Sequence, residues 1–325
     1  EGWPRTLVVP DGTWTQTLVA GTEAATAVIS ATVDGALLTD TASVLMIEEG
    51  NSFDEGTFEI GCEDDAEYVG ATLVVDGGTL VIDRAGCGPL ELEHLLVLSG
   101  TVTHSAFELG QAQTLEISAQ SIYVAGDASI DVSAKGFPKS HWQGGQSWLA
   151  HAKVGGSHGG WGSSGNQEAY SANPVYGSLY DPGTHGAGGN YNGAGGGVVR
   201  LDVAGTLTVH GSIRADGPSN SNAAGGSVSI RADIVTGDGE IGVRGGTIVS
   251  NGYGTGSGGR VAILDYSLLA GAFAEELAGT EGFGVLAHGG QAYGSYCGGA
   301  GTIYLKSAGA EHGALVVVNN GQNGL

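Results

Sequence analysis

The chain has 325 residues, 62 glycines and a formal net charge of −23. The glycines show no Gly-X-Y period, which excludes collagen, and 41% apolar residues are too many for a disordered glycine-rich polymer. The 34 acidic residues against 11 basic ones disfavour nucleic acid as a partner. No run of about 18 apolar residues occurs, so we expect no membrane insertion.

Residues 1–46 alternate polar and apolar side chains, with breaks at Asp11-Gly12 and Asp34-Gly35. This pattern predicts strands joined by tight turns. The opening EGWPRTLVV is typical of a mature or excised segment, so neighbouring domains of a larger protein are among the expected partners.

Residues 48–67 hold the densest group of acidic side chains, including Glu63, Asp64 and Asp65. Because Ca²⁺ takes six to eight oxygen ligands, these three are candidate calcium ligands, and apart from this candidate site we expect no cofactor. The spacing matches no EF-hand loop, and a solvated acidic face is the alternative.

The three cysteines are Cys62, Cys87 and Cys297. Cys62 and Cys87 lie in one β-rich region and predict a disulfide in an oxidising compartment, with Cys297 left buried or free. We therefore expect the chain to be secreted or held at the cell surface.

Residues 71–136 consist of short alternating runs that recur about every 20 residues, which is typical of a solenoid. After Val198 the repeat becomes alignable, with first strands expected to begin at Val198, Val228, Val261 and Thr302. Each unit has small residues, a strand, a turn, a second strand and a glycine exit. We expect Val228 to stack near Val198 and Val261.

Stacked units of this kind bury a continuous core, so the sequence predicts an all-β chain folded as a right-handed parallel β-helix. A β-sandwich is the alternative. We expect a single domain, residues 1–325, with N-terminal coils in 1–136, a long loop insertion in 137–197 and C-terminal coils in 198–325.

The predicted insertion is rich in glycine and in aromatic residues. It holds three of the five Trp and four of the nine His. Its segments GGSHGGWG and YGSLYDPGTHGAGG, followed by the strand unit at 195–217 and by GAGTIYLK, resemble a glycine-rich module of large secreted surface proteins. The resemblance covers residues 155–321 and implies an extracellular right-handed parallel β-helix, with candidate roles for His158 and Tyr176. The chain departs from the pattern at His185 and at residues 190–192.

Exposed rings stack on sugars, so the aromatic residues of this region are candidate ligand-binding residues. Their alternative role is to pack the loop onto the coils. They are Trp142, Trp148, Trp161, Tyr170, Tyr176, Tyr180 and Tyr191.

Four histidines of the region, His141, His151, His158 and His185, match no metal-ligand spacing. A histidine between glycines, such as His158, is more often a hydrogen-bonding strut. If the chain cleaves polysaccharides, His158, His185 and Asp181 are the candidate catalytic residues. Weaker candidates are Lys153, Arg200, Asp202, Arg214, Asp216, Arg231, Asp233, Asp238 and Arg244, of which Arg214, Arg231 and Arg244 are expected to offset acids on the exterior.

The sequence thus favours an extracellular, non-enzymatic binding or adhesion module that recognises carbohydrate or another surface polymer through residues 137–197. A β-helix polysaccharide lyase or glycoside hydrolase and a structural stalk are the alternatives.

Overall fold

The computed structural model describes residues 25–33, 36–46, 51–111, 113–143, 146–147, 153–165, 171–248, 252–292 and 296–321. The chain forms two compact units, residues 1–50 and 51–325, and each is described by itself. In the first unit, β1 (Ala25–Val33) pairs antiparallel with β2 (Ala36–Met46). These strands flank the predicted Asp34-Gly35 turn.

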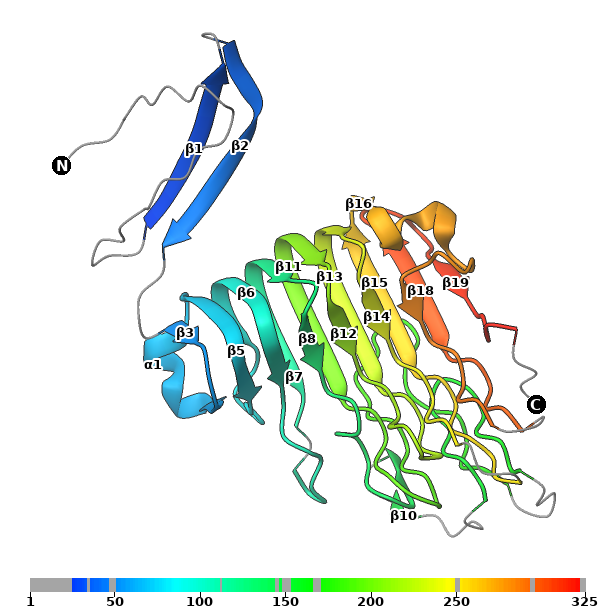
Figure 1. The fold of residues 1–325 in the computed structure, drawn as a ribbon. Helices are drawn as coiled ribbons and strands as arrows, with labels where there is room; N and C mark the ends of the chain where they lie inside the picture. The colour runs from blue at the N-terminus through cyan, green and yellow to red at the C-terminus, as the bar shows by residue number, and fades with distance from the viewer. Residues whose placement is uncertain are drawn as a thin grey trace. The chain divides into compact units, whose positions relative to one another are not determined.

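The second unit is built on one curled sheet of 15 strands, most of them parallel (Figure 1). The only α-helix among its described residues is the short α1 (Asp65–Tyr68), so the all-β prediction is confirmed. Strand pairs run between successive coils in two ladders. The first contains β5 (Thr72–Ile82), β6 (Leu90–Thr103), β7 (Leu115–Val124), β11 (Val198–Val209), β13 (Ser227–Thr236), β15 (Arg260–Tyr266) and β18 (Thr302–Ser307).

The second ladder uses the ends of β5 and β6 and shorter strands: β4 (Thr57–Ile60), β8 (Ala128–Asp131), β12 (Ser212–Arg214), β14 (Glu240–Gly242) and β17 (Val285–Leu286). β3 (Ser52–Phe53) pairs with β5, and β16 (Leu268–Leu269) pairs with β13. At the C-terminal end, β19 (Ala314–Val316) pairs antiparallel with β18. β9 (His141–Trp142) and β10 (Gln146–Ser147) form a small hairpin. Three short 3₁₀ turns are η2 (Cys62–Asp64), η4 (Gly271–Phe273) and η5 (Glu275–Leu277).

The predicted strand starts are confirmed to within one residue. Val228 pairs with Val261 as expected, but its other partner is Val199 rather than Val198. Adjacent valines make the two registers indistinguishable in the sequence, whereas pairing through Val199 aligns Val203 with Ala232 and keeps the inward alternation.

The core consists of aliphatic side chains that stack in columns along the ladders. The column of the first ladder contains Leu73, Leu95, Ile122, Leu207, Val235 and Leu269. The column of the second contains Leu80, Val102, Ile130, Ile213, Ile241 and Val285. Each buried aliphatic side chain contributes about 1.5–3 kcal/mol, and it does so only against its neighbours in adjacent coils.

Glycines stack directly before the first strand of each C-terminal coil. A Cβ on Gly226 would lie 2.0 Å from the carbonyl oxygen of Gly197, and Gly259 and Gly301 stand in the same relation to the glycine of the coil before. These close backbone contacts explain the small-residue entry of every repeat.

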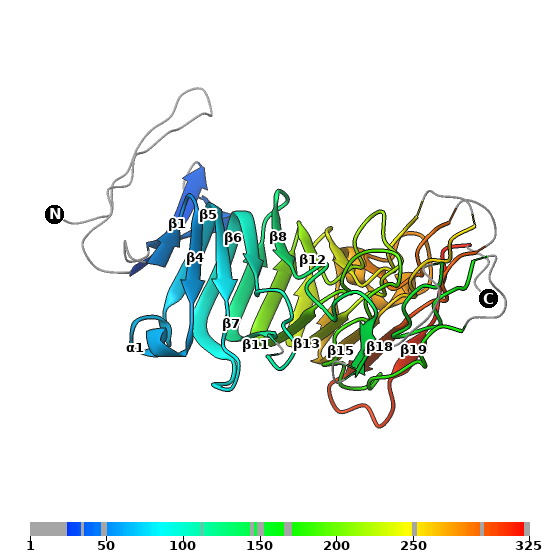
Figure 2. The ribbon, with the colours of Figure 1, turned by 90° about the horizontal axis from the view of Figure 1, so that it is seen from below.

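The glycine-rich connections form a further part of the second unit, here called the glycine layer (residues 153–165, 184–197, 215–226, 252–259, 287–291 and 296–301). Figures 1 and 2 both show them side by side beyond the strand ends. They bond backbone to backbone, as in Gly156 N–H to Asn222 O (2.7 Å) and Gly258 N–H to Gly299 O (3.0 Å). The predicted insertion is therefore joined by connections of later coils rather than lying alone on the scaffold.

Candidate functional site

His158 lies at the centre of the glycine layer and is fully buried. Its Nδ1 lies 2.8 Å from the carbonyl oxygen of Gly225, and its Nε2 lies 2.9 Å from Thr184 Oγ1. A carbonyl only accepts, so Nδ1 carries the proton and Nε2 accepts from the hydroxyl. Burial lowers the pKa of His158 to about 3, and nearby Arg260 acts in the same direction. This neutral ring joins segments far apart in the sequence, as expected of a strut.

His185 is also buried, with Nε2 2.8 Å from the carbonyl oxygen of Gln113. Its ring lies 6.1 Å from that of His104, which is buried and whose Nδ1 donates to Ser105 O. Burial lowers the pKa of His185, and it lowers that of His104 to about 4. His104 was not singled out in the sequence because it lies outside the glycine-rich region.

Tyr176 closes this buried group of rings. Its hydroxyl donates to His185 O (2.8 Å), and its ring lies 4.8 Å from that of His158. It packs in a small cluster with Phe137, on which the half-buried Trp142 also rests. Tyr176 and Trp142 thus pack the segment down, which is the alternative role considered for these rings.

Three other predicted rings are exposed: Trp161 by 53%, Tyr180 by 61% and Tyr191 by 36%. The rings of Tyr180 and Tyr304 meet edge to face at 5.0 Å, and those of Tyr191 and Tyr253 meet at 4.8 Å. Trp148, Tyr170 and His151 lie outside the described residues. A role in ligand binding for the seven rings stays a prediction.

Asp181 lies beside Tyr180 on the outer face of the first ladder. Its carboxylate pairs with Arg200, 2.9 Å from Nη2, and Arg200 also approaches Glu116. The structure therefore does not bring Asp181 into contact with His158 or His185, whose ring nitrogens bond within the layer.

The acidic stretch surrounds the predicted disulfide, which is confirmed between Cys62 and Cys87. Asp65 pairs with the buried Arg84, and Asp64 accepts from Gly61 N–H (2.7 Å). Across the described part of the chain, no three His, Cys, Asp or Glu side chains are grouped to hold a metal. Calcium at Glu63, Asp64 and Asp65 stays a prediction. Cys297 is both buried and free.

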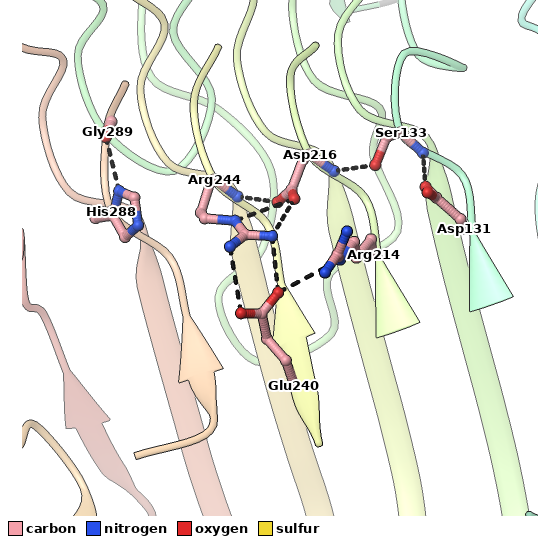
Figure 3. A network of polar contacts seen from close by, with 8 residues as sticks. All are labelled: Asp131, Ser133, Arg214, Asp216, Glu240, Arg244, His288 and Gly289. Atoms are coloured by element: carbon pink, nitrogen blue, oxygen red, sulfur yellow. Dashed lines mark hydrogen bonds and ion pairs between the residues drawn. The ribbon is translucent and has the colours of Figure 1, made fainter. Parts of the chain in front are cut away.

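A network of charges covers the outer face of the second ladder (Figure 3). Arg244 Nη2 lies 2.6 Å from Asp216 Oδ2 and 2.8 Å from Glu240 Oε1. Arg214 Nε lies 3.4 Å from the same Glu240 oxygen, and Arg231 pairs with Asp265 elsewhere on the exterior. The expectation that these arginines offset acids on the exterior is confirmed.

A groove of about 430 Å³ opens beside this network. His210 Nδ1 lies 2.5 Å from Asp238 Oδ1 within it. Asp238 and Arg214 were among the weaker sequence candidates, whereas His210, Glu240 and Glu281 were not. Aligning TVHGSIRADG with VTGDGEIGVRGG places His210 one coil from Asp238, and this signal could have found the pair. The side chains lining the groove are those of His210, Ser212, Arg214, Asp238, Glu240, Ala272, Glu281, Phe283 and Leu286.

No family model, curated protein or solved structure matches the chain. Among the helices that the structure describes, none has the length and apolar character needed to cross a membrane.

Proposed function

We propose that the protein is a right-handed parallel β-helix that acts outside the cell as a non-enzymatic binding or adhesion module. Its ligand is carbohydrate or another surface polymer, and residues 137–197 present the binding surface. The observation that carries the proposal is that residues 137–197 contain both buried rings and exposed rings. Tyr176 and His158 are buried and tie the backbone down, whereas Trp161, Tyr180 and Tyr191 stay exposed.

Exposed rings on a fixed backbone suit binding because little conformational entropy is lost when the ligand docks. Aromatic faces bind the apolar faces of sugars, and the neighbouring polar groups orient the hydroxyls. The Cys62–Cys87 disulfide is consistent with an oxidising compartment, and hence with a secreted or surface location.

The two alternatives receive less support. The residues first considered for catalysis are occupied, because His158 and His185 bond within the layer and Asp181 pairs with Arg200. A stalk built by end-to-end stacking of coils needs an open parallel edge, whereas β19 covers the edge of β18 with an antiparallel strand.

The test is binding to a panel of immobilised polysaccharides, with the triple variant Trp161→Ala, Tyr180→Ala and Tyr191→Ala. We expect its affinity to fall at least tenfold, which corresponds to about 1.4 kcal/mol. Phe58→Ala is the control, since Phe58 is 40% exposed on β4, outside the glycine layer. Wild-type affinity in the triple variant, or new reducing ends released from any polysaccharide, would overturn the proposal.

A further inference from the structure

The groove beside the network of Figure 3 has no part in the ring surface proposed above. Its side chains come from consecutive coils: His210 precedes β12 and Arg214 ends it, Asp238 and Glu240 follow one coil later, and Glu281 comes from the connection before β17. Parallel strands stack at about 4.8 Å, so side chains distant in sequence converge on one place.

Donors and acceptors are interleaved along the groove. Arg214 offers N–H donors, His210 has one ring nitrogen left after bonding to Asp238, and the carboxylates of Glu240 and Glu281 accept. A sugar hydroxyl both donates and accepts, so adjacent hydroxyls match such a lining. We propose that this groove is a binding site for a neutral saccharide.

The charges of the lining select against anionic ligands. Three carboxylates, those of Asp238, Glu240 and Glu281, face one guanidinium, that of Arg214. A uronate, sulfate or phosphate group would meet net repulsion.

Two of the polar groups, Glu240 and His210, are already held in place. Arg244 donates hydrogen bonds to both carboxylate oxygens of Glu240, at 2.8 and 3.3 Å, and the hydrogen bond with Asp238 orients the ring of His210. Such pre-organisation lowers the entropic cost of binding. Arg214 Nε is buried without a hydrogen bond, since its ion pair with Glu240 at 3.4 Å has poor geometry.

The remaining walls and the size also suit a sugar. The partly exposed Ala272 and Leu286 add apolar surface against which the C–H face of a pyranose can pack. The volume, about 430 Å³, lies within the range of about 300–1,000 Å³ typical of small-molecule sites.

The experiment is calorimetric titration of the full chain with neutral trisaccharides of glucose, xylose and mannose, and with trimers of galacturonate and of glucosamine. His210→Ala and Glu281→Ala are expected to weaken binding of a neutral trimer at least tenfold. The matched controls are His312→Ala and Glu276→Ala, which remove exposed residues of the same types away from the groove lining. The triple ring variant is expected to keep this binding, so the failure of either site is seen separately.

The proposal is overturned if His210→Ala and Glu281→Ala bind as tightly as their controls, or if no neutral trimer binds. Tighter binding of the galacturonate or glucosamine trimer than of every neutral trimer would overturn it as well. Binding that disappears only in the triple ring variant would assign the saccharide to the ring surface and reject the groove.

Discussion

The buried histidines His158, in the glycine layer, and His104, outside it, make the stability of the second unit depend on pH. The folded-state pKa is about 3 for His158 and about 4 for His104, against 6.5 for an exposed histidine. The unfolded chain binds a proton at each of them below pH 6.5, whereas the folded chain does not until near pH 4 or below. Stability is therefore greatest above pH 6.5 and falls as the pH drops through this window.

The size of the effect follows from the two pKa values. At pH 4.5 each ring is held neutral about two pH units below 6.5, and one unit corresponds to about 1.36 kcal/mol. Each histidine then costs about 2.7 kcal/mol relative to neutral pH. The pair costs about 5 kcal/mol, which is comparable to the whole stability of many domains, about 5–15 kcal/mol.

Substitution isolates the contribution of one ring. In His158→Asn, an amide N–H can replace Nδ1–H as the donor to Gly225 O, but the side chain does not titrate. Guanidinium unfolding followed by tryptophan fluorescence, repeated from pH 7.5 to pH 4.5, gives the free energy of unfolding at each pH. Wild type is expected to lose up to about 1.4 kcal/mol more per pH unit than the variant between pH 6 and 4.5.

Charged and aromatic groups face His158 and His104 in the folded chain. Arg260, His185 and Tyr176 face His158, and Lys135 and Asp83 act on His104 together with His185. The matched control is an asparagine at the exposed His312, which should keep the wild-type slope. Parallel curves for wild type and His158→Asn would show that His158 is not held neutral, and would refute the reasoning.

Two further predictions concern the glycine layer and the outer network. Gly258→Ala places a Cβ 1.8 Å from Ala287 O. Denaturant unfolding should therefore show a free energy of unfolding lower by about 2 kcal/mol or more, the order expected for a large packing clash. The control Gly126→Ala, whose Cβ would have nothing within 4 Å, should lower it by less than about 1 kcal/mol. Equal losses would contradict the backbone contact. Arg244→Gln should cost about 3 kcal/mol because it leaves the half-buried Asp216 without a cationic partner and Glu240 with Arg214 alone. Arg231→Gln, in an exposed pair, should cost about 1 kcal/mol or less. The same unfolding assay checks the two arginine variants. A larger loss of stability in Arg231→Gln than in Arg244→Gln would show that the network contributes no more than an exposed surface pair.

The coils could be predicted from the sequence because their signal is local. Alternating side chains and a recurring glycine entry placed the strands beginning near Val198, Val228, Val261 and Thr302. Stacking of equivalent positions in adjacent coils then followed, with an error of one residue at Val199. The disulfide also followed from the two cysteines of one β-rich region.

The candidate site could be predicted only in part. The sequence located the rings of residues 137–197, but both buried and exposed rings occur there without a period that separates them. The backbone N–H of His158 donates to the hydroxyl of Ser257, 99 residues later, and no local sequence pattern predicts such a contact. The groove was missed for a related reason, since His210 and Asp238 belong to different coils and each alone looks like a turn residue.

The sequence by itself thus determined the all-β strand pattern, its approximate register and the disulfide, because alternation and the recurring glycine entry are encoded within each repeat. Only the tertiary structure decided that connections from several coils share one glycine layer, which histidines are buried, which rings remain exposed and which charges converge on a groove. These features depend on backbone contacts between segments well over a hundred residues apart, such as Gly299 N–H to Trp161 O, and a glycine-rich sequence carries no periodicity from which such contacts can be derived.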